Sequence, residues 1–425
     1  MKILNKANKL PSITYILFFI TSLSFFFQPL LIRPFGIPLS FTLLLLLNLF
    51  LIFSSKNIKI YEIIYLIIVG TILLMVDLVT PPELYRGFIF LNMLLFTFLS
   101  SKHFMSEKQS RAIWLSVLMV CFSLSLIGLK RWITGYTVDN SENETGIVDS
   151  VATYFYLGIS YLNSTRNSDA FYFAIPVILA FSYLKNKFIK FKYLFLSIFL
   201  ITIFCSIASL SRGIVVSLIL SYVISSRAYK LNKQIYKYII YFLTFVFFIF
   251  VFYDSLKNIP GVEMISNLTL NGFLSLVDPL QASNNLDGKY TYSNNLRIEL
   301  AIDSLNTFLE FPFGLGLDNI PPGRVVGKFG ESVFMLHSEN TYLDFLISLG
   351  IFSIPSFIFI FQKLKNLHYL SKFHFESKKL YFLLLFALIY SIFLSTTDVY
   401  FYWFIISIIC MEYNNYKINL VDEKN

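Results

Sequence analysis

The sequence predicts an all-α membrane protein that crosses a bilayer about twelve times, and three observations support this prediction. The 425 residues are 56% hydrophobic and only 14% charged, whereas a soluble domain has about 25% charged residues. Apolar runs that approach the roughly 20 residues needed by a spanning helix recur along the chain. Short clusters of Lys and Arg separate these runs, as the positive-inside rule describes.

Twelve apolar stretches are candidate spans, and the shortest of them make the total approximate. The stretches 169–184, 213–226 and 399–412 are short for a helix that crosses a hydrocarbon core. The full set is 12–32, 37–54, 60–79, 84–101, 112–129, 169–184, 191–209, 213–226, 235–253, 341–361, 380–396 and 399–412.

The distribution of basic residues predicts the orientation of these spans. If the N-terminus is cytoplasmic and the spans alternate, the inside segments hold most of the 34 Lys and Arg residues. Both termini are then cytoplasmic, the first helix is uncleaved, and two long loops, at about 130–169 and 254–340, face outward. We therefore expect an N-terminal transmembrane bundle (1–253), a large periplasmic loop (254–340) and C-terminal spans with a cytoplasmic tail (341–425).

The second long loop contains its own predicted helix over 295–311. Asn294 and Asn295 are suitable N-caps, and Pro312 with Gly314 ends the helical pattern. We expect the apolar face of this helix to rest on the membrane domain or at the bilayer interface. The residues that recur at helical spacing are Ile298, Ala301, Ile302, Leu305, Phe308 and Leu309.

Several classes of function are excluded by the pattern of charges and motifs. The net charge of +9 is not gathered on one face or tail, so we expect no nucleic-acid partner. The three cysteines lie inside apolar runs, and no metal-ligand cluster or phosphate-binding loop is present, so we expect no cofactor and no metal. An enzyme on the outer face has no cytoplasmic nucleotide pool, so its substrate must carry its own leaving group.

Arginines in outward-facing segments are candidate anion-binding residues. Arg212 lies at the tight turn between two short spans, where a buried charge requires an anionic partner or must snorkel to the interface. Arg297 opens the predicted loop helix, and Arg324 follows a Pro-Pro-Gly sequence.

Titratable residues precede the span at 341–361. His337 is a suitable general base near neutral pH, and Glu339 near a helix N-terminus complements the helix dipole. The same cluster, which includes Asn340, is also compatible with an ordinary helix cap at the interface.

These motifs together resemble the bacterial O-antigen polymerase/ligase family, which comprises Wzy-type polymerases and lipid A-core ligases. The His337 cluster departs from the ligase pattern, because Glu339 and not His337 stands directly before Asn340, and this favours a polymerase. The motifs are Ser211-Arg212-Gly213, Asn294-Asn295-Leu296-Arg297 with the later Pro312-Phe313-Gly314-Leu315-Gly316, and His337-Ser338-Glu339-Asn340-Thr341-Tyr342-Leu343 with Leu349-Gly350-Ile351.

The resemblance implies polymerisation of polyprenyl-diphosphate-linked oligosaccharide units at the outer face of the bacterial inner membrane. Its implied partners are this lipid-linked glycan, membrane lipid, a candidate chain-length regulator and a flippase. Arg212 and Arg297 would hold the diphosphate, because guanidinium groups bind phosphate oxygens bidentately. The remaining candidates are His337 or Glu339 as the base, and Arg324, Asn340 and Arg166 as substrate contacts.

Two other functions remain as alternatives. A ligase of the same family would join the glycan to lipid A-core. A lipid-linked oligosaccharide flippase would also have many spans, but we expect it to carry charges within spans that line a central cavity.

Overall fold

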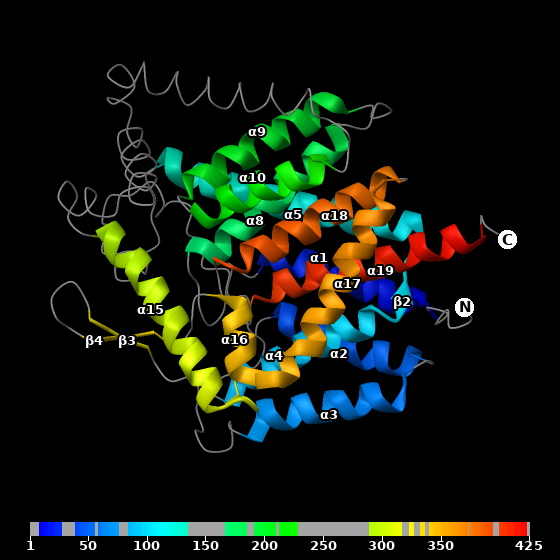
Figure 1. The fold of residues 1–425 in the computed structure, drawn as a ribbon. Coiled ribbons are helices and arrows are strands. Elements are labelled where there is room, and N and C mark those ends of the chain that lie inside the picture. Colours follow the sequence, from blue (N-terminus) through cyan, green and yellow to red (C-terminus); the bar gives the residue numbers. More distant parts are fainter. Residues whose placement is uncertain are drawn as a thin grey trace, which may run out of the picture.

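The computed structural model of the chain describes most of the predicted spans. The described residues are 8–27, 39–55, 58–75, 84–134, 166–184, 191–209, 212–227, 289–316, 323–326, 332–335, 340–372, 374–393 and 399–422. Within these ranges the chain is almost entirely helical, which confirms the all-α class (Figure 1). Two short two-stranded sheets complete the described part.

The helices coincide closely with the predicted apolar stretches, except that 235–253 lies outside the described residues. Before the second long loop they are α1 (Ser12–Phe27), α2 (Leu39–Ser54), α3 (Ile60–Met75), α4 (Leu84–Ser100), α5 (Glu107–Thr134), α8 (Arg166–Leu184), α9 (Lys192–Ala208) and α10 (Arg212–Arg227). After it come α15 (Lys289–Glu310), α16 (Thr341–Leu349), the 3₁₀ helix η3 (Gly350–Ser353), α17 (Ile354–Leu370), α18 (Phe375–Tyr390) and α19 (Tyr400–Asp422).

Two of the described helical segments, Glu107–Thr134 and Thr341–Leu370, are long and apolar enough to cross a membrane. Seven further apolar stretches, within α1, α2, α3, α4, α8, α9 and α10, are shorter, at 10–17 residues. The total of twelve spans and the periplasmic position of the large loop therefore stay predictions.

Three helices form the centre of the bundle and are buried on all sides. In α8 every residue of 170–180 is buried, and the same holds for 379–388 in α18 and 401–414 in α19. Aromatic rings join them, since Phe171 of α8 stacks on Phe386 and Tyr390 of α18, with ring centroids 5.7 Å apart in each pair. A helix that is apolar around its whole circumference is buried either in a protein core or in a membrane, and these three are enclosed by other helices.

The outer helices bury one side and expose an apolar stripe on the other. On α3 the exposed stripe contains Ile60, Ile63, Ile64 and Ile67. On α17 it contains Ile354, Ile358 and Phe361, which recur at i, i+4 and i+7. Such wide apolar exposure is expected for helices that face lipid.

The two ends of the bundle have different structures. Strand β1 (Asn8–Lys9) pairs in parallel with β2 (His103–Phe104). The side-chain amide of Asn414 in α19 donates a hydrogen bond to the His103 carbonyl at 2.9 Å. Both ends of the described chain therefore lie at one end of the bundle, which we call the terminal end (Figure 1). Helix α15 lies across the opposite end, which we call the loop end.

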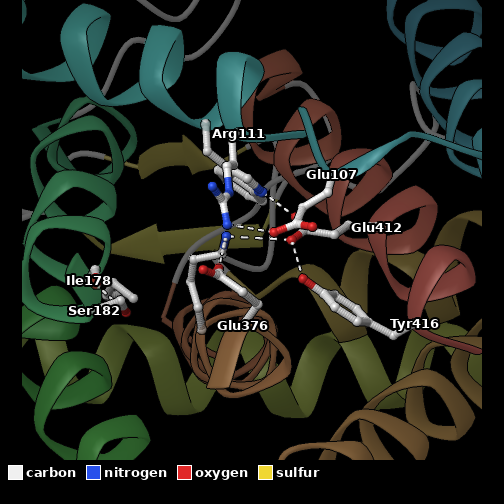
Figure 2. A network of polar contacts seen from close by, with 9 residues as sticks. Glu107, Arg111, Ile178, Ser182, Glu376, Glu412 and Tyr416 are labelled. Carbon is white, nitrogen blue, oxygen red and sulfur yellow. Dashed lines mark hydrogen bonds and ion pairs between the residues drawn. The ribbon is translucent and has the colours of Figure 1, made fainter. Parts of the chain in front are cut away.

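A buried ionic network fixes the terminal end (Figure 2). The Lys379 ammonium lies 2.9 Å from the Glu376 carboxylate and 3.5 Å from that of Glu412. Trp114 and Tyr416 also donate hydrogen bonds to Glu412. Burial alone would lower the pKa of Lys379, but the two carboxylates outweigh it and hold the pKa above its usual range. The network therefore joins α5, α18 and α19. Its central side chains are almost fully buried, since Lys379 is 3% exposed and Glu412 is 4% exposed.

We expect Lys379→Met to destabilise the protein strongly, because Glu412 would keep its buried charge and lose its cation. Loss of one member of a buried pair costs about 3–5 kcal/mol. Thermal unfolding of the purified protein measures this effect. Arg111→Ala is the matched control, since Arg111 pairs with Glu107 in the same region but both side chains are mostly exposed. Equal unfolding temperatures for the two variants would contradict the assigned role of Lys379.

We expect a second stability effect at His103, which lies between α4 and α5. Burial lowers the pKa of this imidazole, whose ring contacts Ser54 at 2.9 Å and the Leu99 carbonyl at 3.0 Å. The folded state thus favours the neutral ring. The contribution of His103 to folding stability is therefore present above about pH 6.5, and it is lost as the pH falls through the lowered pKa of the folded state. Unfolding temperature measured against pH should fall less steeply below pH 6.5 in His103→Gln; an unchanged slope would refute this assignment.

Candidate functional site

Three segments of the chain meet at the loop end. The turn Ser391–Phe393 follows α18, and the Thr341 amide of α16 donates to the Ser391 carbonyl at 2.9 Å. A Cβ atom added to Gly213 would lie only 2.7 Å from the Phe393 Cβ, so α10 begins directly against the same turn. The first residues of α10 and α16 are therefore neighbours through Ser391–Phe393, although about 130 positions separate them in the sequence.

Asn340 is the N-cap of α16. Its side-chain oxygen accepts hydrogen bonds from the amides of Tyr342 at 3.0 Å and Leu343 at 3.3 Å. The Tyr342 hydroxyl in turn donates to the Leu388 carbonyl of α18 at 2.7 Å. Asp344 is fully buried in the first turn, where an acidic group suits the helix dipole. The start of α16 is thus fixed in position immediately after the His337 cluster.

The predicted span 341–361 is interrupted in the structure, which corrects the expectation of one continuous helix. Helix α16 ends at Leu349, and Gly350 adopts φ = +56°. A chain reversal of this kind releases carbonyl groups from the helical hydrogen-bond ladder. Beside the break, the Tyr65 hydroxyl of α3 donates to the Phe352 carbonyl at 2.8 Å.

The segment that follows α15 satisfies the released backbone groups. The amides of Leu315 and Gly316 donate to the carbonyls of Ile347 and Ser348, each at 2.9 Å. In the opposite direction, the Ile351 amide donates to the Pro312 carbonyl at 2.9 Å. We call this set of three bonds between 312–316 and 347–351 the backbone junction.

Two glycines make the backbone junction sterically feasible. A Cβ atom on Gly350 would lie 2.1 Å from the Pro312 carbonyl oxygen, and one on Gly314 would lie 2.5 Å from the Ser348 carbonyl oxygen. Both residues also have positive φ angles, which favour glycine. The glycines of the sequence motif therefore serve a close approach of two backbones, which joins α15 to α16.

Helix α15 packs along α16 through a narrow buried edge. Leu300 and Ser304 are buried on one edge of α15, and the structure extends the predicted helix 295–311 to Lys289–Glu310. Of the predicted apolar face, Ile302, Leu305 and Leu309 are exposed, so its position on the membrane domain or at the bilayer interface stays a prediction. Residue 297 precedes Ser304 by seven positions, so the two α-carbons lie on the same side of the helix.

The structure places the backbones of most candidate site residues. Arg212 is the first residue of α10 and Asn340 caps α16, so both flank the turn Ser391–Phe393. Arg297 belongs to α15, which packs on α16. Arg324 lies in β3 (Gly323–Val326), which pairs with β4 (Ser332–Met335), and Arg166 begins α8. His337 and Glu339 lie outside the described residues.

Sequence reasoning missed the turn Ser391–Phe393 and the role of Gly350. The turn was placed inside the predicted span 380–396, because Ile392 and Phe393 continue the apolar run. Only Gly350 gave a local signal, as a glycine within an otherwise apolar helix. Among the described residues, no group of three or more His, Cys, Asp or Glu side chains is arranged to hold a metal ion.

Comparison with known proteins agrees with the family resemblance. The Wzy_C family model, described as O-antigen ligase, matches residues 197–358. The matched segment contains Arg212, Arg297, Arg324 and Asn340 and both partners of the backbone junction. No curated protein matches the chain. The match supports an activity of the O-antigen polymerase/ligase type, and the apolar helices agree with a membrane protein.

We expect Gly350→Ala to disrupt the backbone junction, because the methyl group would overlap the Pro312 carbonyl and strain a positive φ. The strain alone is worth about 1–3 kcal/mol. Limited proteolysis should show faster cleavage in 311–316, with a lower unfolding temperature. Gly70→Ala is the control, since its new Cβ would meet only the Leu91 side chain at 3.4 Å. Wild-type cleavage and stability in Gly350→Ala would contradict the role of the junction.

Proposed function

We propose that this protein polymerises polyprenyl-diphosphate-linked oligosaccharide units into O-antigen or a related surface polysaccharide. The reaction takes place at the outer face of the bacterial inner membrane. The loop end faces the periplasm in this proposal, and both termini are cytoplasmic. The observation that carries the proposal is the family match over 197–358, since the matched segment includes Arg212 and the cap of α16, which flank one turn.

The proposed chemistry is a glycosyl transfer. The bond between the anomeric carbon of the donor sugar and its phosphate oxygen breaks, and its electron pair leaves with the diphosphate. The acceptor hydroxyl oxygen forms the new glycosidic bond, and its proton passes to a base. His337 or Glu339 is the proposed base, and a positioned base contributes about 10²–10⁴ in rate. The step requires no redox cofactor, and we propose that it is metal-independent.

Arg212 and Arg297 are the proposed diphosphate ligands. Charge-assisted hydrogen bonds from guanidinium groups contribute about 1.5–3 kcal/mol each. They also stabilise the negative charge that grows on the leaving group. Helix α10 begins at the turn that contacts α16, and α15 packs on α16, so α16 connects the elements that carry the two arginines. Arg324, Asn340 and Arg166 are proposed glycan or phosphate contacts.

A ligase is the second candidate function, because the matching family model is described as O-antigen ligase. The two activities differ in the acceptor, which is a lipid-linked glycan for the polymerase and lipid A-core for the ligase. A polymerase defect leaves a single repeat unit attached to lipid A-core, whereas a ligase defect leaves none. The flippase alternative receives no support from the match.

We expect Arg212→Ala and Arg297→Ala each to abolish long polysaccharide chains in cells while the protein still inserts in the membrane. Gel analysis of lipopolysaccharide would show a single repeat unit in place of the ladder. Arg111→Ala at the terminal end is the control and should keep the ladder, because its pair with Glu107 is exposed. Normal ladders from both loop-end variants would refute the proposed roles.

An experiment with purified protein separates the three functions. Reconstituted with lipid-linked repeat units alone, a polymerase lengthens the glycan, a flippase only moves it across the bilayer, and a ligase acts only when lipid A-core is added.

A further inference from the structure

Helix α15 exposes an apolar surface that no other described element covers. Beyond its buried edge at Leu300 and Ser304, the helix shows large apolar side chains at positions i, i+3 and i+7. The segment that follows the helix adds one exposed aromatic ring. The exposed fractions are 52% at Ile302, 47% at Leu305, 74% at Leu309 and 64% at Phe313.

The exposed surface of α15 has a polar half beside the apolar half. Asp303, Asn306 and Glu310 are exposed at positions that recur every three to four residues, so they form a second stripe. At 100° per residue, the apolar stripe lies roughly opposite the buried edge, and the polar stripe lies on one flank between the two. A helix with this division is suited to a boundary between an apolar and an aqueous medium.

The apolar stripe of α15 continues into the lipid-facing side of α17. The Phe313 ring lies 6.5 Å from the Phe352 ring of η3. Ile351 is exposed beside it, and the exposed stripe of α17 begins at Ile354. The backbone junction fixes α15 relative to this surface, so the helix cannot turn its apolar stripe away.

We infer that α15 lies in the interface of the bilayer leaflet at the loop end, with Ile302, Leu305, Leu309 and Phe313 inserted among the lipids. The occupant is lipid because the stripe forms one surface with the membrane-facing side of α17. The polar stripe with Asp303, Asn306 and Glu310 then faces water. The large loop is thereby held at the membrane surface by lipid as well as by α16. This inference does not depend on the proposed transferase activity.

Spin labels on single cysteines test the inference in lipid nanodiscs. Leu305→Cys and Leu309→Cys report the apolar stripe, and Asn306→Cys and Glu310→Cys are matched controls on the same helix. Oxygen partitions into lipid, whereas a nickel chelate stays in water. We expect labels at 305 and 309 to collide with oxygen several-fold more than with the chelate, and labels at 306 and 310 to show the reverse. Cys121, Cys205 and Cys410 are buried, and the labelled wild type measures their background.

Two results would overturn the inference. Strong collision with the nickel chelate at 305 and 309 would place the stripe in water. Weak collision with both reagents would mean that protein covers it, either a second copy or another segment of this chain. The unfolding temperature of each labelled variant is compared with that of the wild type. A match ensures that either result concerns the native fold. Because no activity is measured, either outcome leaves the transferase proposal to its own test.

Discussion

The loop end depends on one constraint, which is that peptide groups released by a broken helix must find hydrogen-bond partners in an apolar setting. The break at Gly350 frees carbonyls of α16, and the segment 312–316 supplies amide donors to them. Only residues without a Cβ permit this approach, since the two backbones come within 2.5 Å of where the Cβ atoms of Gly314 and Gly350 would lie. The position of α15, and with it that of residue 297, follows from this contact.

Buried polar groups find their partners in different ways at the two ends of the bundle. At the terminal end the charges of Lys379, Glu376 and Glu412 neutralise one another inside the protein, so they serve to hold helices together. At the loop end the described polar contacts are mostly backbone bonds and a helix cap, which position chain segments relative to one another. The described contacts at both ends therefore hold chain segments in place.

Composition and periodicity predicted most of the fold, because a spanning or buried helix needs an apolar run whose length is visible in the sequence. The predicted stretches 60–79 and 84–101 correspond closely to α3 and α4. The break after Leu349 and the end of α18 at Tyr390 were missed, because hydropathy does not register a backbone reversal. The ionic network was also missed, since Trp114 and Glu412 are 298 positions apart. The convergence of Arg212 and Asn340 depends likewise on a turn contributed by a third, distant segment.

The enclosure of α8 has a consequence for biogenesis. Its rings at Phe171 and Tyr172 stack on Phe386 and Phe401, which the ribosome adds more than 200 residues later. In a nascent chain these aromatic faces therefore lack their stacking partners until α18 and α19 have been synthesised. Closure of the bundle belongs to the last stage of synthesis, so a premature stop before α18 would leave these rings of α8 without their stacking partners, although α5 and α9, which also pack on α8, would be present.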